Sequence, residues 1–206
     1  MFRRLVDSPA LYDVLQRLVG HTEFKRHLAR HLDALPLRAR VVDVGSGTGT
    51  LGATLDRDRY VCLDLDGAKL RRSRREGGVR LAVQGDATAC PLAAACADAV
   101  ICAKLTHHLD DRSLTAAFAE MLRLVSPLGV VIVADAVASP RLISRVLWRI
   151  DRGSHVRSAE AILDAVPRSA RVVTRERFRL GRFHEFLLFV VRPNAHVVGP
   201  FGSPSP

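Results

Sequence analysis

The stretch Val41–Gly49, with the sequence VVDVGSGTG, decides the fold of this 206-residue chain. Its first four residues are mostly β-branched and apolar, as in a strand buried in a parallel sheet. The three glycines that follow let the backbone turn sharply and approach a ligand without side chains in the way. The stretch therefore predicts a strand that runs into a ligand-binding turn, followed by a helix from about Thr50 to Asp56.

Strands and helices alternate along the rest of the chain. Helices are expected at Gly67–Arg75, which Gly77 and Gly78 would stop, and at Asp111–Val125, which Pro127 and Gly129 would end. Such alternation predicts an α/β fold with a mostly parallel sheet and helices on both faces. The expected strands are Arg40–Val44, Tyr60–Asp64, Val79–Val83, Asp98–Ala103, Leu128–Ala134, Ala170–Phe178 and Phe183–Val191.

The pattern indicates one domain, residues 1–192, with no repeat or linker. N-terminal helices are expected in residues 1–37, and the proline-rich tail 193–206 is expected to be disordered. An inserted, lid-like segment is expected at residues 140–167, beside the carboxyl edge of the sheet where ligands bind in such folds. Within it, Arg141, Arg145 and Arg149 recur at helical spacing beside apolar residues, which predicts an amphipathic helix.

Acidic residues follow the next two strands. Asp64 ends the second strand 19 residues after Gly45, a spacing at which a carboxylate can accept hydrogen bonds from ribose hydroxyls. Asp66 competes for this role, although it lies beyond the strand and can instead cap the next helix. The segment Gly85-Asp86-Ala87 follows the third strand, where a carboxylate can accept a hydrogen bond from an adenine amino group.

Together these motifs resemble the class I S-adenosylmethionine (SAM)-dependent methyltransferases, in particular their broad small-molecule group, similar to type 11. The resemblance covers about half of the chain, from Arg38 to Asp135. Besides VVDVGSGTG, YVCLDLD and GDA, it includes Asp98–Cys102 leading to Leu105–Leu109, and Met121–Gly129 as a variant of the group's LxPGG turn. Ser46 stands where many relatives carry Cys, and Leu128 replaces the first glycine of LxPGG.

The resemblance implies a Rossmann-like sheet of seven strands with the last strand antiparallel. It also implies that the turn Gly45–Gly49 holds the methionine part of SAM, that Asp64 binds the ribose, and that Asp86 and Ala87 meet the adenine. The product would be S-adenosylhomocysteine (SAH). The expected cofactor-binding residues are Asp43, Gly45, Ser46, Gly47, Gly49, Asp64, Leu65, Asp86, Ala87 and Ala103.

Two other functions fit part of the pattern. A nicotinamide-dependent Rossmann enzyme shares the strand, the turn and the acid, but its GxGxxG fingerprint needs a glycine where this chain has Thr50. A SAM-binding protein without transfer activity, acting as a partner or scaffold, is the other alternative. The enzyme is favoured because the glycines and both ligand carboxylates are present.

Methyl transfer from a sulfonium needs chiefly a well-placed acceptor, and a general base only where the acceptor loses a proton. The candidate bases are His107 and His108, after the fourth strand, and His155 in the inserted segment. Lys104 and Asp135 are further candidates near the acceptor. No [DNS]-P-P-[YFW] tetrapeptide follows the fourth strand, which disfavours amino-methylation and leaves a small-molecule acceptor, with oxygen as the commonest acceptor atom.

The composition of the chain indicates which kinds of partner to expect. The net charge is +10, nearly all of it from arginine, which favours an acidic or lipid-like acceptor or peripheral contact with an anionic membrane. Few aromatic residues are present for base stacking, so nucleic acid is disfavoured as a partner. The four cysteines form no metal-ligand spacing, and no metal is expected. The N-terminus lacks a signal-peptide pattern, so the expected location is the cytoplasm. The sequence does not indicate an oligomeric state.

Overall fold

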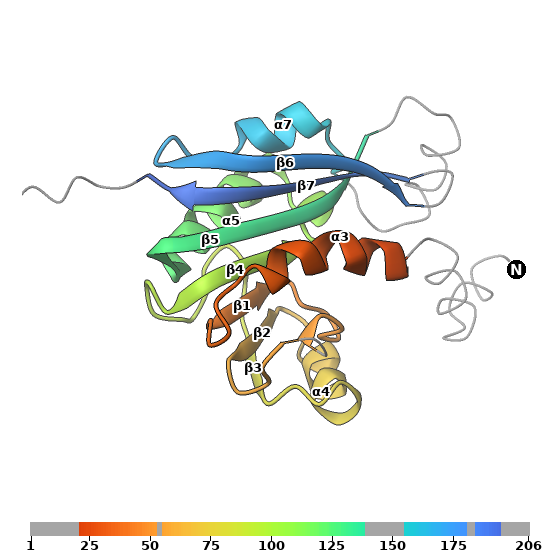
Figure 1. Ribbon diagram of the computed structural model, residues 1–206, viewed down its shortest axis with the longest axis vertical. Coiled ribbons are helices and arrows are strands. Elements are labelled where there is room, and N and C mark those ends of the chain that lie inside the picture. Colours follow the sequence, from red (N-terminus) through yellow and green to blue (C-terminus); the bar gives the residue numbers. More distant parts are fainter. Residues whose placement is uncertain (1–20, 53–54, 139–154, 181–183, 195–206) are drawn as a thin grey trace, which may run out of the picture.

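The computed structural model describes residues 21–52, 55–138, 155–180 and 184–194 (Figure 1). Its longer helices are α3 (His21–Asp33), α4 (Gly67–Glu76) and α5 (Asp111–Leu124), with a short helix α7 (Ala159–Asp164) and a 3₁₀ turn η2 (Thr106–His108). The strands are β1 (Val41–Val44), β2 (Tyr60–Asp64), β3 (Leu81–Gln84), β4 (Ala97–Ala103), β5 (Val125–Val137), β6 (Ala170–Leu180) and β7 (His184–Pro193).

The seven strands form one sheet in the order β3-β2-β1-β4-β5-β7-β6. Strands β1 to β5 pair in parallel, whereas β7 pairs antiparallel with both β5 and β6. Six strands therefore run one way and the last strand runs the other way, which confirms the expected Rossmann-like methyltransferase fold. Reversal of strand order on either side of β1 and β4 creates the crevice at the carboxyl edge where open α/β sheets bind ligands.

Helices cover both faces of the sheet, as Figure 1 shows with α3 on the near face and α5 behind. On one face, Phe24 and Leu28 of α3 and Leu70 of α4 join a buried cluster with Ile101 and Leu188. The opposite face has its own cluster, in which α5 and α7 pack on the other side of the same strands. Alternate side chains of each strand feed the two clusters, and such burial on both faces explains the nearly continuous apolar runs in the sequence.

The segment after the glycine-rich turn differs from the expectation. Instead of a helix over Thr50–Asp56, the described residues form tight turns, in which Gly52 N donates to Gly49 O and Leu55 N donates to Gly52 O. Gly52 packs against the ring of Tyr60, where an added Cβ would lie 2.5 Å from Cε1. The two glycines and this close contact favour successive turns over a regular helix.

The connection from α5 to β5 also differs. The helix ends at Leu124, and β5 begins at once at Val125, so Pro127 and Gly129 lie within the strand rather than ending the helix. Asp135 therefore sits inside β5 and not at its end. The other expected boundaries agree within two residues, apart from the end of β5, which lies three residues later, at Val137.

Some expectations fall on residues outside the described ranges. These are the helices expected before His21, the arginine row at Arg141, Arg145 and Arg149, and nearly all of the tail from Pro193. Of the inserted segment, residues 155–167 are described, and they include α7. Within the described part of the chain, no helix is long and apolar enough to cross a membrane.

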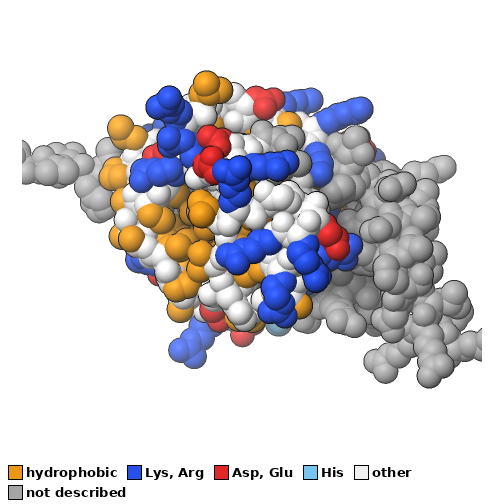
Figure 2. Space-filling view, turned by 90° about the horizontal axis from the view of Figure 1, so that it is seen from below, with side chains coloured by type: hydrophobic (Ala, Val, Ile, Leu, Met, Phe, Trp, Pro, Cys, Tyr) orange, Lys and Arg blue, Asp and Glu red, His pale blue; other side chains and the backbone are white. Residues whose placement is uncertain are grey.

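The basic residues of α4 lie on the surface. Arg71, Arg72, Arg74 and Arg75 are exposed, and Ser73 between them is buried. Figure 2 looks at this end of the molecule and shows Lys and Arg side chains gathered beside an apolar patch. The run is thus a solvated helix face, while Leu70 and Ser73, three residues apart, form the buried side of the helix.

Substitution of Gly47 and Gly49 separates the two requirements of the turn, which are a positive φ and room for a side chain. Both have positive φ, +68° and +57°, but a Cβ at Gly49 would lie 2.9 Å from Val79, whereas a Cβ at Gly47 meets nothing within 4 Å. We expect Gly47→Ala to lower the free energy of unfolding by ~1 kcal/mol. Gly49→Ala adds overpacking, for a loss of ~2–4 kcal/mol. Urea denaturation of the ligand-free protein measures both, and equal losses would contradict the packing argument.

Candidate functional site

The glycine-rich turn lies at the carboxyl end of β1, in the middle of the sheet. Gly45, Gly47 and Gly49 all have positive φ, a conformation that L side chains rarely adopt. Gly45 lies against Leu105, and an added Cβ would come within 2.8 Å of Leu105 Cδ2. The Cβ direction of Gly47 leads into open space. The turn therefore presents bare backbone on its open side while its other glycines are packed against the protein.

Asp64 fixes this turn from the end of β2. Its Oδ2 accepts a 2.7 Å hydrogen bond from Gly47 N, and its Oδ1 accepts a 2.8 Å bond from Asp66 N. The side chain is 8% exposed. A carboxylate has about four lone-pair positions, so each oxygen retains acceptor capacity. The residue that the spacing assigns to the ribose is thus held rigidly beside the turn and can accept further hydrogen bonds.

Asp66, the competitor, has a different role. Its Oδ1 accepts from Ala68 N at 2.8 Å and from Lys69 N at 3.3 Å, which makes it the N-cap of α4. This capping role is the one that the sequence offered as its alternative.

The segment after β3 lies on the other side of β2. Asp86 is exposed, and its Oδ1 accepts from both Thr88 N and Thr88 Oγ1 at 2.8 Å. Both bonds lower the pKa of Asp86, the one from the Thr88 backbone most strongly, and favour its ionised form. Ala87 is buried, and Leu65 is 68% exposed between β2 and the α4 cap. An exposed leucine beside a fixed carboxylate can cover one face of a flat ring while the carboxylate meets its edge.

Asp43 lies beneath the turn, fully inside the sheet at 1% exposure. Its Oδ2 accepts a hydrogen bond from the Tyr60 hydroxyl. Burial, together with the smaller effect of the nearby Asp64 charge, raises the pKa of Asp43 to about 7 despite this bond. Burial and the Asp43 charge likewise raise the pKa of Tyr60 well above its usual range. Asp43 is thus bonded to Tyr60 of β2, whose ring packs against Gly52 just after the turn.

A buried network holds the turn η2 that follows β4. Asp135 of β5 accepts hydrogen bonds from Thr106 Oγ1 at 2.6 Å, from His107 N at 3.2 Å and from His107 Nδ1 at 2.7 Å. Burial alone would raise the pKa of Asp135, but the bonds from His107 and Thr106 outweigh it and hold the pKa below its usual range. His107 is 6% exposed. Its imidazole therefore anchors the turn to β5.

His108 and His155 lie on the outer side of this network. His108 is exposed, and its ring lies 4.1 Å from that of His107. His155 is also exposed, and its backbone N–H donates to His107 O at 3.1 Å. Its charge contributes to a lowered pKa of Asp110, although the hydrogen bonds from Ser113 are the main cause. The structure thus brings all three histidines expected from the sequence to one turn at the carboxyl edge.

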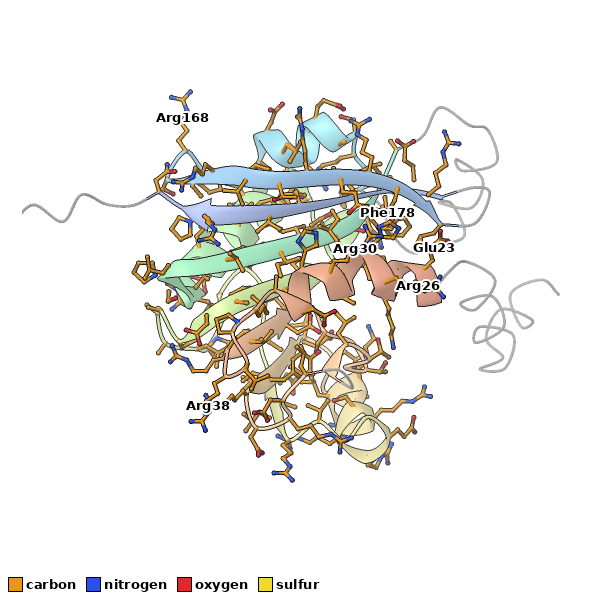
Figure 3. The ribbon with its side chains drawn as sticks, in the orientation of Figure 1. Glu23, Arg26, Arg30, Arg38, Arg168 and Phe178 are labelled. Atoms are coloured by element: carbon orange, nitrogen blue, oxygen red, sulfur yellow. The ribbon has the colours of Figure 1, made fainter. Side chains whose placement is uncertain are left out.

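Lys104 and helix α3 border the same edge. Lys104 has a positive φ of +59°, and its ammonium lies 4.5 Å from the centroid of the Phe24 ring. Ala103, the residue before it, ends β4. Figure 3 shows Arg30 of α3 near Phe178 of β6. Between these elements His27 stacks on Phe178 and its Nδ1 lies 2.8 Å from Glu176 Oε1. This side of the edge therefore combines buried aromatic rings with basic groups, of which His27 and Arg30 contact the Glu176 carboxylate.

Several supporting residues could not be foreseen. Tyr60, Thr106 and Arg157 each make a contact on which the site depends, and each is separated from its partner by many residues in the sequence. Arg157 lies two residues after His155, but a lone arginine before a helix gives no signal of its own. Among the described residues, no group of three or more His, Cys, Asp or Glu side chains is arranged to hold a metal ion.

Comparisons with known proteins agree with this geometry. Residues 41–129 match a family model described as a methyltransferase domain. The PH0226 protein of Pyrococcus horikoshii OT3 superposes with a TM-score of 0.67 at 17% identity, covering 92% of this chain and 93% of that one. A putative methyltransferase of Bacillus halodurans C-125 gives 0.67 at 18%, covering 80% and 97%.

A third structure was solved with its ligands. It is the geranyl diphosphate C-methyltransferase of Streptomyces coelicolor A3(2), in complex with Mg²⁺, geranyl diphosphate and SAH. Its TM-score is 0.69 at 13% identity, covering 84% of this chain and 81% of that one. No curated protein sequence matches the chain.

The methyltransferase domain at residues 41–129 and the sheet order together indicate a SAM-dependent methyltransferase. Its cofactor is SAM. The described residues fit this cofactor, because bare backbone beside Gly47 opens next to a fixed carboxylate with spare acceptor capacity.

The buried Asp43 makes stability depend on pH. Its pKa is raised from 3.8 to about 7 in the folded protein, so its protonated form favours folding. This contribution is complete below the unfolded pKa and is lost as the pH rises through the folded pKa. We expect the parent's free energy of unfolding, relative to Asp43→Asn, to fall by ~3 kcal/mol between pH 4 and 7 and then to level off.

Urea denaturation at a series of pH values measures this difference. Asp135 and the other shifted carboxyls are common to both proteins, so their effects cancel. A difference that does not change with pH would contradict the assignment.

Proposed function

We propose that this methyltransferase transfers the methyl group of SAM to an oxygen atom of a small molecule. The observation that carries the cofactor part of the proposal is the pairing of Asp64 with Gly47 N, which places a buried carboxylate beside bare, open backbone. SAM supplies an electrophilic methyl group at this edge of the sheet, so the remaining work of the protein is to position the acceptor.

Each part of the proposed cofactor site has a group suited to it. The turn Gly45–Gly49, which includes Ser46 and closely follows Asp43, would hold the methionine part, with Ala103 at the adjacent strand end. Asp64 would accept from the ribose hydroxyls with the lone pairs that Gly47 and Asp66 leave. Leu65 would cover one face of the adenine, and the Asp86–Ala87 segment would meet its edge.

The proposed base is His108 or His155. A neutral imidazole near the reacting centre can take the acceptor's proton at neutral pH. His107 is less suited, because its Nδ1 is bonded to the buried Asp135 and it has little exposure. His108 on the turn η2 and His155, whose backbone N–H donates to His107 O of that turn, are both exposed. In this scheme His107 and Asp135 keep the turn rigid, and one of the exposed histidines moves the proton.

A small acceptor with acidic or lipid-like character is favoured by the basic and aromatic groups along the edge. Lys104 lies over the buried ring of Phe24, and Arg30 lies 3.8 Å from Glu176, so two cationic groups border this edge. The similar geranyl diphosphate methyltransferase acts on an acceptor that is both anionic and apolar, as its name states.

A screen for methyl transfer should therefore compare hydroxylated acids and phenols with matched thiols and amines, using SAM labelled in its methyl group. Transfer to none of them, combined with tight SAH binding, would favour the alternative of a SAM-binding protein without transfer activity. Transfer to a thiol or amine alone would correct the acceptor atom.

Calorimetry tests the cofactor site. We expect tight binding of SAM and SAH and little affinity for NAD. Loss of a hydrogen-bonded carboxylate costs ~1.5–3 kcal/mol, so Asp64→Ala should weaken SAM binding roughly ten- to a hundredfold.

Asp66→Ala is the matched control. It removes the cap of α4, which costs ~1 kcal/mol of stability, and should leave SAM affinity close to that of the parent. Asp64→Asn keeps the side-chain shape if Asp64→Ala folds poorly. Parental affinity in both Asp64 variants, with weak binding in Asp66→Ala, would assign the ribose to Asp66 instead.

Comparison of His108→Ala with His155→Ala identifies the base once the screen supplies an acceptor. Loss of a general base should lower the single-turnover rate by ~10²–10⁴ and leave SAM affinity intact. Parental rates in both variants would mean that catalysis depends on positioning alone.

A further inference from the structure

Arg157 joins three parts of the chain that meet at the proposed acceptor side. It lies between β5 and α7, and its own carbonyl accepts a 2.7 Å hydrogen bond from Ala138 N, just beyond the end of β5. The next residue, Ser158, caps α7 by accepting from Ala161 N. Its backbone is thus fixed from both directions, and its side chain extends from a firm base.

The guanidinium of Arg157 uses all three of its nitrogens. Nη2 donates to Leu109 O at 2.7 Å, and Nη1 donates to Thr106 O at 3.1 Å and to His155 O at 2.9 Å. Nε donates to Asp111 Oδ1 at 2.8 Å. The arginine side chain is 11% exposed, whereas that of Asp111 is 94% exposed. The three backbone carbonyls are therefore the sheltered partners, and the ion pair with Asp111 is a solvent-exposed addition of small weight.

These contacts close a ring around the turn η2. From below, Asp135 holds Thr106 and His107 through their side chains. On its other side, Arg157 donates to the carbonyls of Thr106, the first residue of the turn, and of Leu109, the residue that follows it. His155 is held twice, since its N–H donates to His107 O and its carbonyl accepts from Arg157. Both exposed histidines are thus attached to backbone that Arg157 fixes.

We propose that Arg157 is a positioning residue of the methyl-transfer reaction: it sets the spacing between His108 and His155 at the acceptor side. The inference rests on the proposed function of these two histidines. A guanidinium suits this role because its planar, rigid set of donors can reach three carbonyls at once, whereas the single ammonium of a lysine acts as a point charge. A displacement of about 1 Å in a reacting group can lower a rate about a hundredfold.

The test compares Arg157→Ala and Arg157→Lys with Arg123→Ala. Arg123 is a matched control, because its guanidinium also bonds two backbone carbonyls, those of Cys90 and Leu92, together with the Glu120 carboxylate. It serves the loop before β4 and does not contact η2. Asp111→Asn is a second control that removes only the exposed partner of Arg157.

Imidazole resonances of the full chain, recorded with and without SAH, give the first measurement. In both Arg157 variants we expect the ring signals of His108 and His155 to move and the amide of His155 to exchange faster, while the signal of His27 on α3 stays in place. Arg123→Ala and Asp111→Asn should retain the parental signals of His108 and His155. Added guanidinium ion at millimolar concentration should partly restore the signals in Arg157→Ala.

Transfer kinetics give the second measurement. At saturating SAM, with the acceptor found by the screen, Arg157→Ala should lower the single-turnover rate at least about tenfold while leaving SAM affinity near that of the parent. Unmoved histidine signals, or a parental rate with moved signals, would overturn the proposal. If the parent protein itself does not bind SAH, the proposed cofactor site is refuted. The resonances of the ligand-free variants test the role of Arg157 independently of that result.

Discussion

The two hydrogen bonds of the Asp64 carboxylate to Gly47 N and Asp66 N determine how the rest of the site is arranged. They connect the end of β2 to the turn after β1 and to the start of α4, so three elements meet at one buried charge. Because the carboxylate is 8% exposed, each bond replaces water that the charge would otherwise keep. The same oxygens retain lone pairs toward the open side, so one group both supports the turn and can bind a ligand.

The turn after β4 is likewise held by a buried carboxylate, in the other half of the carboxyl edge of the sheet. Asp135 is buried inside β5 and satisfies its charge with Thr106, His107 and Ala136. Removal of one partner of such a pair leaves an uncompensated buried charge, which is far more costly than the pair itself is stabilising. The network therefore specifies one conformation of η2. Rigid support beneath and exposed imidazoles above are what a positional mechanism requires.

Much of the fold could be predicted from the sequence because its signals are local. The glycines of the turn, the apolar runs of β1, β2, β4 and β5, and the spacing of α5 each follow from a few neighbouring residues. The prediction of a helix after Gly49 was wrong because Gly52 packs on Tyr60. No local sequence pattern indicates this contact with β2. Strand β5 begins before Pro127 for a similar reason, since Val125 pairs with Ala97 of β4.

Site residues with a local sequence signal could be predicted, whereas those that depend on tertiary contacts could not. Asp64 has a characteristic distance from the turn, and the histidines follow a strand end, so their positions could be inferred. The burial of His107 against Asp135, and the reach of Arg157 to Thr106 and Leu109, depend on tertiary contacts across 28 to 51 residues. Which histidine supports the turn and which faces outward therefore became visible only in the folded chain.

A crystal structure of the protein with SAH would show which carboxylate holds the ribose. We expect both ribose hydroxyls to bond to Asp64, the homocysteine to lie along Gly45–Gly49, and the sulfur to face the turn that carries His108. A ribose bonded to Asp66, or SAH bound away from the glycine-rich turn, would contradict this assignment.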